Sequence, residues 1–336
     1  MTEHQTLEKS VRDKAREWLE SGDLKYFIGY DKGKYSSKAR PAFIYNAEDA
    51  ESLVVDPTCA SNLTRYVVDE VQYKPGRGEK PDTRPVGIVV KPCDSKTLVE
   101  LMKENILPRE RVKIIGLTCR GIVSQEKLEE VLAELPGWDD AGSEFELDDE
   151  KLTVSAGGKK KTVAAAGVLA GKCLVCTHHN PLVADEVFGE PVEDPETDEF
   201  GDTRDLEEMS QEERWDYWSA ELSRCVRCYA CRDACPLCYC EQCVFDKYKP
   251  FKWNEFSVKL RENLYYQMVR AMHLAGRCVD CGDCERSCPM GIPIRKINRF
   301  LLKRAWDRFK TEPGVNIDDP RMFSSYDVGD PEEEIL

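Results

Sequence analysis

The sequence predicts two domains: an α/β N-terminal domain with a small parallel sheet of βαβ units, and a mainly α-helical C-terminal domain. Three observations carry this prediction. Strand-like and helix-like stretches alternate up to about residue 135, two cysteine runs that each end in proline follow beyond residue 220, and helix-like stretches surround those runs. Such alternation is typical of a parallel sheet covered by helices. With 336 residues, the chain is long enough for two cores.

The expected N-terminal domain spans residues 1–183 and begins with an amphipathic helix. Apolar residues recur at helical spacing from Leu7 to Leu19, and Gly22 ends the pattern. Short runs rich in valine, isoleucine and aromatic residues indicate strands, and longer periodic runs indicate helices. In chain order we expect strands at 26–30 and 42–45, a helix at 59–71, a strand at 86–90, a helix at 95–105, a strand at 112–116, a helix at 124–135 and a small β element at 144–168.

Two of these strands end in a cysteine turn. Cys93 follows the strand at 86–90, and Cys119 follows the strand at 112–116. Ligands of open α/β sheets gather outside the carboxyl ends of the strands. Cysteines at two strand ends therefore indicate a binding site.

Residues 184–211 are rich in Asp and Glu, with Pro and Gly between them. This composition predicts a solvated acidic linker, and an acidic docking surface is the alternative. We expect the helical domain at 212–312 and a loosely held C-terminal tail at 313–336. Within the helical domain we expect an amphipathic helix at 212–223, a basic aromatic stretch at 247–253, a long helix at 254–275 and a basic helix at 292–309.

The two cysteine runs have the spacing of bacterial ferredoxins, with two, two and three residues between successive cysteines. Three closely spaced thiolates bind one 4Fe-4S cluster, and the fourth cysteine of each run binds the other cluster. We therefore expect a dicluster ferredoxin domain with crossed ligands. One cluster takes Cys225, Cys228, Cys231 and Cys288, and the other takes Cys278, Cys281, Cys284 and Cys235. Zinc is the alternative, but zinc sites use Cys-x-x-Cys pairs and have no use for the third cysteine and the proline.

Eight of the sixteen cysteines lie outside these two clusters. We expect four of them to bind a third 4Fe-4S cluster, namely Cys93, Cys119, Cys173 and Cys176. The alternative is a pair of buried thiols and half of a zinc site. The remaining four cysteines are Cys59, Cys238, Cys240 and Cys243. They form a fourth cluster only if the fold brings them together. Cys59 equally joins the Cys93 group or binds nothing.

Composition excludes several classes of function. The net charge of −15 argues against nucleic acid as a main partner, because phosphate binding needs excess Lys and Arg. No stretch approaches the roughly 20 apolar residues of a membrane span, and the N-terminus is charged where a signal peptide is apolar. We therefore expect a soluble cytoplasmic protein whose cysteines bind metal. Neither a Gly-x-Gly-x-x-Gly fingerprint nor a Walker A motif is present.

Several segments resemble the beta subunits of formate dehydrogenases and of deazaflavin-coenzyme-reducing hydrogenases. They are Cys-Ala-Ser-Asn-Leu at 59–63, Val-Val-Lys-Pro-Cys-Asp-Ser-Lys at 89–96, Ile-Ile-Gly-Leu-Thr-Cys-Arg-Gly at 114–121, Cys-Leu-Val-Cys at 173–176 and the run at 225–243. The stretch Met-His-Leu-Ala-Gly-Arg-Cys at 272–278 resembles helical ferredoxin modules like those of heterodisulfide reductase. Lys96 departs from the family pattern, in which we expect arginine.

The resemblance implies an electron-transfer subunit of an anaerobe's multi-subunit oxidoreductase, partnered by a catalytic subunit and other electron-transfer subunits. Some relatives also bind FAD and reduce a deazaflavin coenzyme, although no flavin contact carries over residue by residue. Two hypotheses follow. In the first, the chain has no substrate of its own and relays single electrons between a catalytic subunit and a partner carrier. In the second, it is a flavin enzyme that exchanges hydride with a deazaflavin or nicotinamide coenzyme and passes single electrons to its clusters. Flavin content separates the two. A metal-dependent scaffold with clusters that are never reduced is a third alternative.

Overall fold

A computed structural model describes residues 3–322, apart from 77, 79, 81, 136–141, 196–197 and 247–256, together with residue 329. Contacts divide the chain into two compact units, Met1–Thr197 and Asp198–Leu336. The predicted basic aromatic stretch at 247–253, the start of the helix at 254–275 and most of the tail at 313–336 lie outside the described residues. None of the described helices is both long and apolar enough to cross a bilayer.

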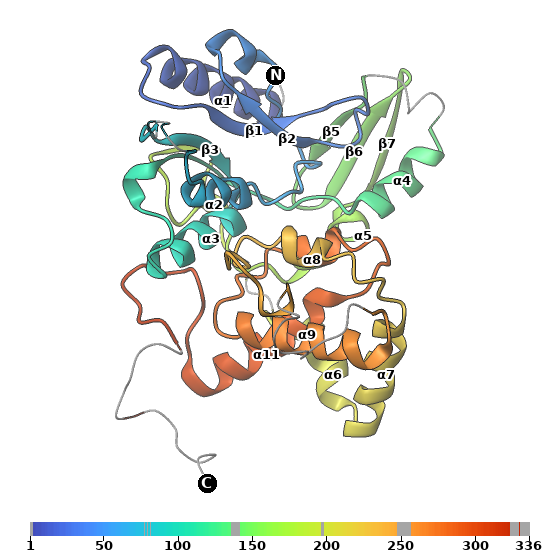
Figure 1. The fold of residues 1–336 in the computed structure, drawn as a ribbon. Coiled ribbons are helices and arrows are strands. Elements are labelled where there is room, and N and C mark those ends of the chain that lie inside the picture. Colours follow the sequence, from blue (N-terminus) through green and yellow to red (C-terminus); the bar gives the residue numbers. More distant parts are fainter. Residues whose placement is uncertain are drawn as a thin grey trace. The chain divides into compact units, whose positions relative to one another are not determined.

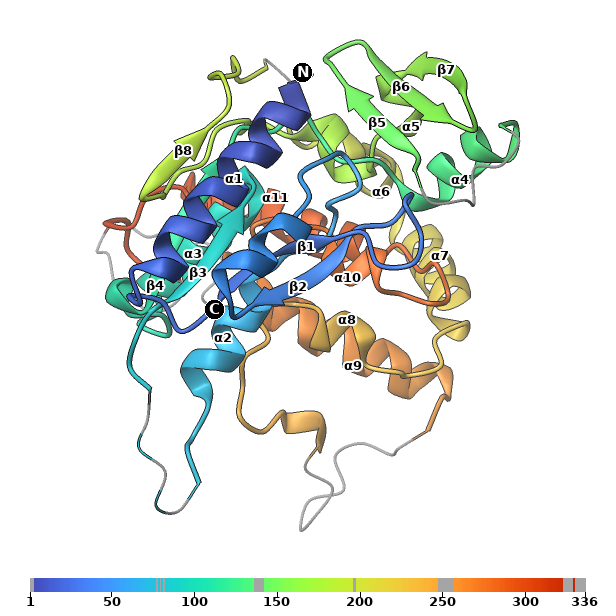
Figure 2. The ribbon, with the colours of Figure 1, turned by 90° about the horizontal axis from the view of Figure 1, so that it is seen from above.

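The first unit is built on a five-stranded sheet with the order β2-β1-β3-β4-β8 (Figures 1 and 2). Four strands run parallel: β1 (Phe27–Asp31), β3 (Val86–Val90), β4 (Val112–Leu117) and β8 (Glu186–Phe188). The edge strand β2 (Arg40–Ile44) pairs antiparallel with β1, because the two are joined as a hairpin. The α/β prediction is confirmed, and the sheet departs from a parallel arrangement at this edge.

Helices cover both faces of the sheet, with α1 (Glu3–Glu20) on one face and α2 (Thr64–Gln72) and α3 (Pro92–Lys103) on the other (Figure 1). The helix α1 buries Leu7, Val11 and Ala15, which recur every four residues on one side. The helix α3 starts three residues earlier than predicted, since Pro92 occupies the first turn and the Asp94 carboxylate accepts the backbone N–H of Lys91 at 3.1 Å. This start places Cys93 at the N-terminal end of the helix.

A smaller antiparallel sheet completes the first unit. It consists of β5 (Glu144–Leu147), β6 (Lys151–Ala156) and β7 (Lys159–Ala164). Alternate residues of β6 are buried, and they share one core with α4 (Gln125–Ala133) and α5 (Ala165–Val168). The predicted helix at 124–135 and the β element at 144–168 correspond to these elements.

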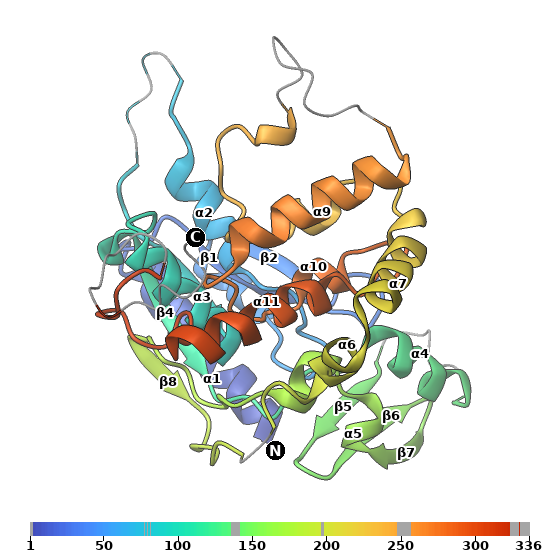
Figure 3. The ribbon, with the colours of Figure 1, turned by 90° about the horizontal axis from the view of Figure 1, so that it is seen from below.

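The second unit is helical and contains α6 (Arg204–Glu208), α7 (Gln211–Ser223), α8 (Ala230–Asp233), α9 (Leu260–Leu274), α10 (Asp283–Arg286) and α11 (Ile294–Phe309). The long helix α9 packs against both α7 and α11 (Figure 3). A capping box starts α7, because the Ser210 hydroxyl accepts the N–H of Glu213 and the Glu213 carboxylate accepts the N–H of Ser210. The two short helices α8 and α10 each contain the third cysteine of a ferredoxin run.

The stretch 184–211, expected to be a linker, contains ordered elements of both units. The strand β8 pairs with β4 in the large sheet. Its side chains stay exposed or only partly buried, because strand pairing uses the backbone. In the second unit, Asp202 pairs with both Arg295 and Arg299 of α11. The stretch thus contains a strand and ion-paired carboxylates, and the bounds of a linker within it stay a prediction.

Candidate metal centres

One cavity in the second unit brings together cysteines from both ferredoxin runs. Its lining includes Cys225, Cys228 and Cys231 of the first run and Cys288 of the second, with Tyr266 and Gln267 of α9 beside them. Burial raises the pKa of the Cys225 thiol, and the other three thiols are close enough to raise it further. These four cysteines are the set expected for the first crossed cluster.

Each run wraps its cysteines with residues in the left-handed region. In the first run Arg227 (φ 51°) and Tyr229 (φ 61°) flank Cys228, and in the second Asp280 (φ 59°) and Gly282 (φ 75°) occupy the equivalent positions. Left-handed residues reverse the chain within a few residues, so that consecutive thiols point to one side and backbone N–H groups turn toward sulfur. The N–H of Arg227, for example, lies 3.4 Å from the Cys225 sulfur.

Cysteines of the second crossed set also lie near one another. Burial raises the pKa of Cys278 to about 11, and the neighbouring charges that raise it include those of Asp280 and Cys235. Burial likewise raises the pKa of Cys284, with Cys235 and Cys278 adding to the effect. Cys235 from the first run therefore lies with two thiols of the second, and Cys281 is partly buried.

Polar side chains lie around these sulfurs. Among the described residues, no group of three His, Cys, Asp or Glu side chains that could hold one metal ion is found. Polar groups instead approach individual sulfurs, with Gln267 Nε2 lying 3.7 Å from Cys231 Sγ and Asn298 Nδ2 3.9 Å from Cys284 Sγ. Hydrogen bonds to sulfur are a feature of protein-bound clusters.

The first unit gathers the other four predicted ligands at the carboxyl ends of β3 and β4. Cys93 lies in the first turn of α3, Cys119 follows β4, and Cys173 and Cys176 belong to a short 3₁₀ turn and its end. Backbone N–H groups of Gly121 and Ile122 point to the sulfurs of Cys119 and Cys173, each at 3.4 Å. The sulfurs thus receive the amide hydrogen bonds that thiolate ligands use.

Electrostatic coupling links these four thiols to one another. Burial is the largest cause of the raised pKa of Cys119, and the charges of Cys173 and Cys93 raise it further. Burial also raises the pKa of Cys176, to which Cys173 adds. The Lys172 ammonium, 3.5 Å from the Cys93 sulfur, opposes the rise in the pKa of that thiol. The arrangement is a four-thiol group with a cation beside it, which would offset part of the negative charge of bound thiolates.

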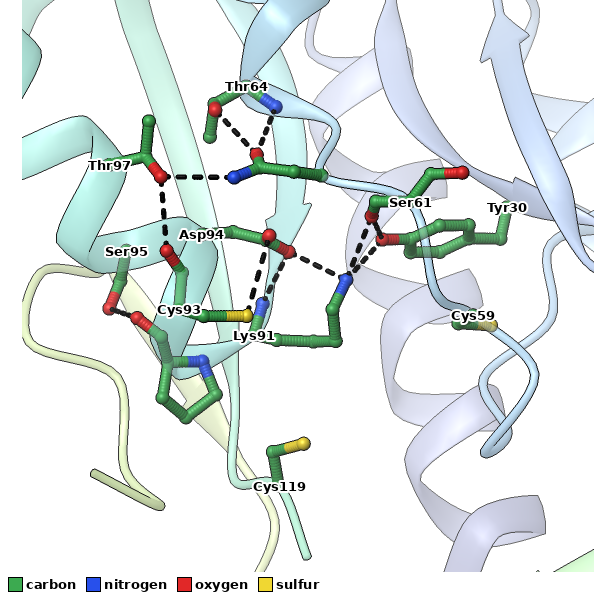
Figure 4. A network of polar contacts seen from close by, with 12 residues as sticks. Tyr30, Cys59, Ser61, Thr64, Lys91, Cys93, Asp94, Ser95, Thr97 and Cys119 are labelled. Carbon is green, nitrogen blue, oxygen red and sulfur yellow. Dashed lines mark hydrogen bonds and ion pairs between the residues drawn. The ribbon is translucent and has the colours of Figure 1, made fainter. Parts of the chain in front are cut away.

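A pocket opens beside Cys119, at the ends of β1, β3 and β4. The lysine that lines it, Lys91, is 5% exposed, and its ammonium lies 2.7 Å from the Asp94 carboxylate and 3.0 Å from the Ser61 carbonyl oxygen. The Tyr30 hydroxyl contacts the same ammonium (Figure 4). Sequence reasoning missed Tyr30, Lys91 and Lys172. The only available signal was that both lysines lie one or two residues before a cysteine.

Cys59 lines this pocket too, and burial together with the nearby Asp56 charge raises its pKa to about 12. The other members of the hypothetical fourth set belong to the second unit. Cys238 lies within hydrogen-bonding distance of Cys235, Cys240 is exposed, and Cys243 packs partly buried against the core. The grouping of these four thiols stays a prediction.

Comparison with known proteins agrees with both halves of this description. Residues 83–201 match the model of the C-terminal part of the family "Coenzyme F420 hydrogenase/dehydrogenase, beta subunit", and residues 221–292 match the model "4Fe-4S dicluster domain". The first match covers β3, β4 and all four cysteines at their ends. The second covers the ferredoxin runs, so the helical unit carries a 4Fe-4S dicluster domain.

Two curated relatives align over most of the chain. The beta subunit of the F420-dependent formate dehydrogenase of Methanocaldococcus jannaschii is 27% identical over 84% of this chain and 86% of its own length. The beta subunit of F420-dependent formate dehydrogenase 1 of Methanococcus maripaludis is 24% identical over 90% and 89%, respectively. Among solved structures, a chain of the F420-reducing [NiFe] hydrogenase complex of Methanosarcina barkeri matches with a TM-score of 0.40 and 16% identity, over 53% of this chain and 64% of that one. The chain is thus similar over most of its length to the beta subunits of F420-dependent formate dehydrogenases, and its residues 83–201 match the family of coenzyme F420 hydrogenase and dehydrogenase beta subunits.

Proposed function

We propose that this chain is the iron–sulfur electron-transfer subunit of an F420-dependent oxidoreductase complex of the formate dehydrogenase or hydrogenase type. It relays single electrons between a catalytic subunit and a partner carrier. The observation that carries the proposal is the cavity that joins Cys225, Cys228 and Cys231 to Cys288. A cavity shared by both runs is what crossed ligation of two clusters requires.

In this proposal the four thiols at the ends of β3 and β4 hold a third 4Fe-4S cluster. Their mutual coupling and the amide hydrogen bonds to Cys119 and Cys173 support it. Bound clusters of this kind take up and release one electron each. The chain's own part is to hold the thiolates, supply amide and lysine partners to the sulfurs, and keep the centres largely buried.

A second candidate function is that of a flavin enzyme, and the observation in its favour is the pocket beside Cys119. The pocket lies at the strand ends, where cofactors of α/β sheets bind, and it contains the buried Lys91 ammonium. A flavin held there would exchange hydride with a deazaflavin or nicotinamide coenzyme next to the proposed cluster. Cys59 and Tyr30 would then line the flavin site, and Cys59 would not serve a fourth cluster.

The test uses the anaerobically purified full-length chain. As a conduit it accepts electrons from dithionite and passes them to a dye, but it turns over neither formate, hydrogen, NADH nor reduced F420 until its partner subunits are added. Cys119→Ser should lower the iron content by about four atoms and leave the ferredoxin pair spectroscopically intact. Flavin-dependent turnover of reduced F420 by the chain alone would transfer the assignment to the second candidate.

A further inference from the structure

The long helix α9 has its polar residues on the buried side. Asn263, Tyr266, Gln267 and Arg270 recur at spacings of three and four and are each at most 5% exposed, while Met268 and Met272 are more than half exposed. Such a pattern is the reverse of an ordinary surface helix. The buried polar stripe must therefore serve something that the apolar core does not provide.

Arg270 is the charged member of this stripe. Its Nη2 donates to the Cys231 carbonyl oxygen at 2.9 Å, and its Nε and Nη1 have no hydrogen-bond partner among the described residues. No described carboxylate pairs with it. A guanidinium cannot lose its proton in a protein, so the charge is permanent. A buried charge without a counter-charge is costly, and such groups are normally paired or near a metal centre.

The counter-charges within reach are cysteine sulfurs of both proposed clusters. The thiols whose charge interacts with the Arg270 guanidinium are Cys284, Cys235, Cys238 and Cys231. Cys231 belongs to the first crossed set, and Cys284 and Cys235 belong to the second. Arg270 is thus a buried cation whose charge acts on cysteines of both sets, and it contacts the first set directly through the Cys231 carbonyl oxygen.

Resting on the dicluster function proposed above, we propose that Arg270 is the fixed positive charge that offsets the negative charge of both clusters and raises both reduction potentials. Each cluster takes up one electron when it is reduced, and no bond forms or breaks. A permanent cation stabilises the form with the extra electron more than the form without it. Because the charge of one guanidinium acts on cysteines of both sets, its removal shifts both potentials in the same direction.

The test is a potentiometric titration of full-length, anaerobically purified protein with dithionite as the reductant, followed by electron paramagnetic resonance of each cluster. Arg270→Gln removes the charge but keeps a donor for the Cys231 carbonyl oxygen. Both potentials should become more negative, whereas Arg270→Lys, which retains the charge, should restore most of the difference. Arg261→Gln is the matched control, because Arg261 is on the same helix with 69% of its side chain exposed.

Different failures of this experiment separate the two proposals. Wild-type protein without clusters would refute the dicluster function itself. Loaded Arg270→Gln protein with unchanged potentials, or with a shift equal to that of Arg261→Gln, would overturn only the role of Arg270. If Arg270→Gln does not bind iron, Arg270→Met, which is neutral and has no unpaired donors, replaces it. If both neutral variants lose iron and Arg270→Lys keeps it, the result supports the charge-offsetting role. If all three variants lose iron, the charge-offsetting role is refuted, because the shape of the arginine side chain would then be what matters.

Discussion

Replacement of Cys288 by serine tests the crossed ligation most sharply. Cys288 follows α10 in the second run, yet it lines the cavity that holds the three leading cysteines of the first run. Iron–sulfur clusters select soft thiolate ligands, for which a serine hydroxyl is a poor substitute. We expect Cys288→Ser to lose the cluster bound by Cys225, Cys228 and Cys231, although those three residues are unchanged.

The size of the effect follows from the number of proposed sites. Three 4Fe-4S clusters correspond to about 12 iron atoms per chain, so loss of one cluster leaves about eight. The Cys235→Ser variant should lose the same amount of iron but from the other cluster. Iron content alone therefore does not distinguish the crossed from the uncrossed assignment.

Electron paramagnetic resonance of the reduced protein makes the distinction. The references are Cys228→Ser and Cys281→Ser, which alter equivalent positions, each flanked by residues with positive φ. In the crossed assignment the spectrum of Cys288→Ser matches that of Cys228→Ser. A match with Cys281→Ser instead would refute the crossed assignment.

Two further predictions concern the stability of each unit. In the first unit, Gly116→Ala places a methyl carbon 2.7 Å from a ring carbon of Pro181. We expect denaturant titration to show that the free energy of unfolding falls by about 1–3 kcal/mol. The control is Gly167→Ala, which should be tolerated because the space around its new methyl group is open. In the second unit, Arg295→Ala removes a two-bond pair with Asp280, both bonds at 2.6 Å, and leaves that carboxylate largely buried. Because Arg299 still lies 3.5 Å from the Asp280 carboxylate, the expected loss is about 1–3 kcal/mol, less than for a buried charge left unpaired. An effect no larger than that of Arg204→Ala, whose ion pair is exposed, would contradict the importance of burial.

The sequence predicts best those parts whose signal is local and strong. The continuous apolar run of β3 gives the strand at 86–90, which is buried along its whole length. The ferredoxin runs likewise indicate both the dicluster domain and the pairing of Cys288 with the first run, because that spacing has one main use. Cysteines at the ends of β3 and β4 are predicted to lie together, since parallel strands bring their carboxyl ends to one edge.

Other parts depend on contacts that the sequence does not display. The strand β8 is three residues long within an acidic stretch, and it forms because β4 offers an unpaired backbone edge. Lys172 and Lys91 matter through their distance to sulfur, which depends on the tertiary fold. Arg270 carries a weak signal in the polar stripe of α9, but only the structure shows that this stripe is the buried face.

The most direct test of the central claim is the iron, sulfide, zinc and flavin content of anaerobically prepared full-length protein. Three 4Fe-4S clusters predict about 12 iron and about 12 sulfide per chain, with little zinc. If the chain is a conduit, flavin is absent. Stoichiometric zinc with no sulfide would contradict the account, because the cysteine runs would then bind single metal ions that cannot carry electrons.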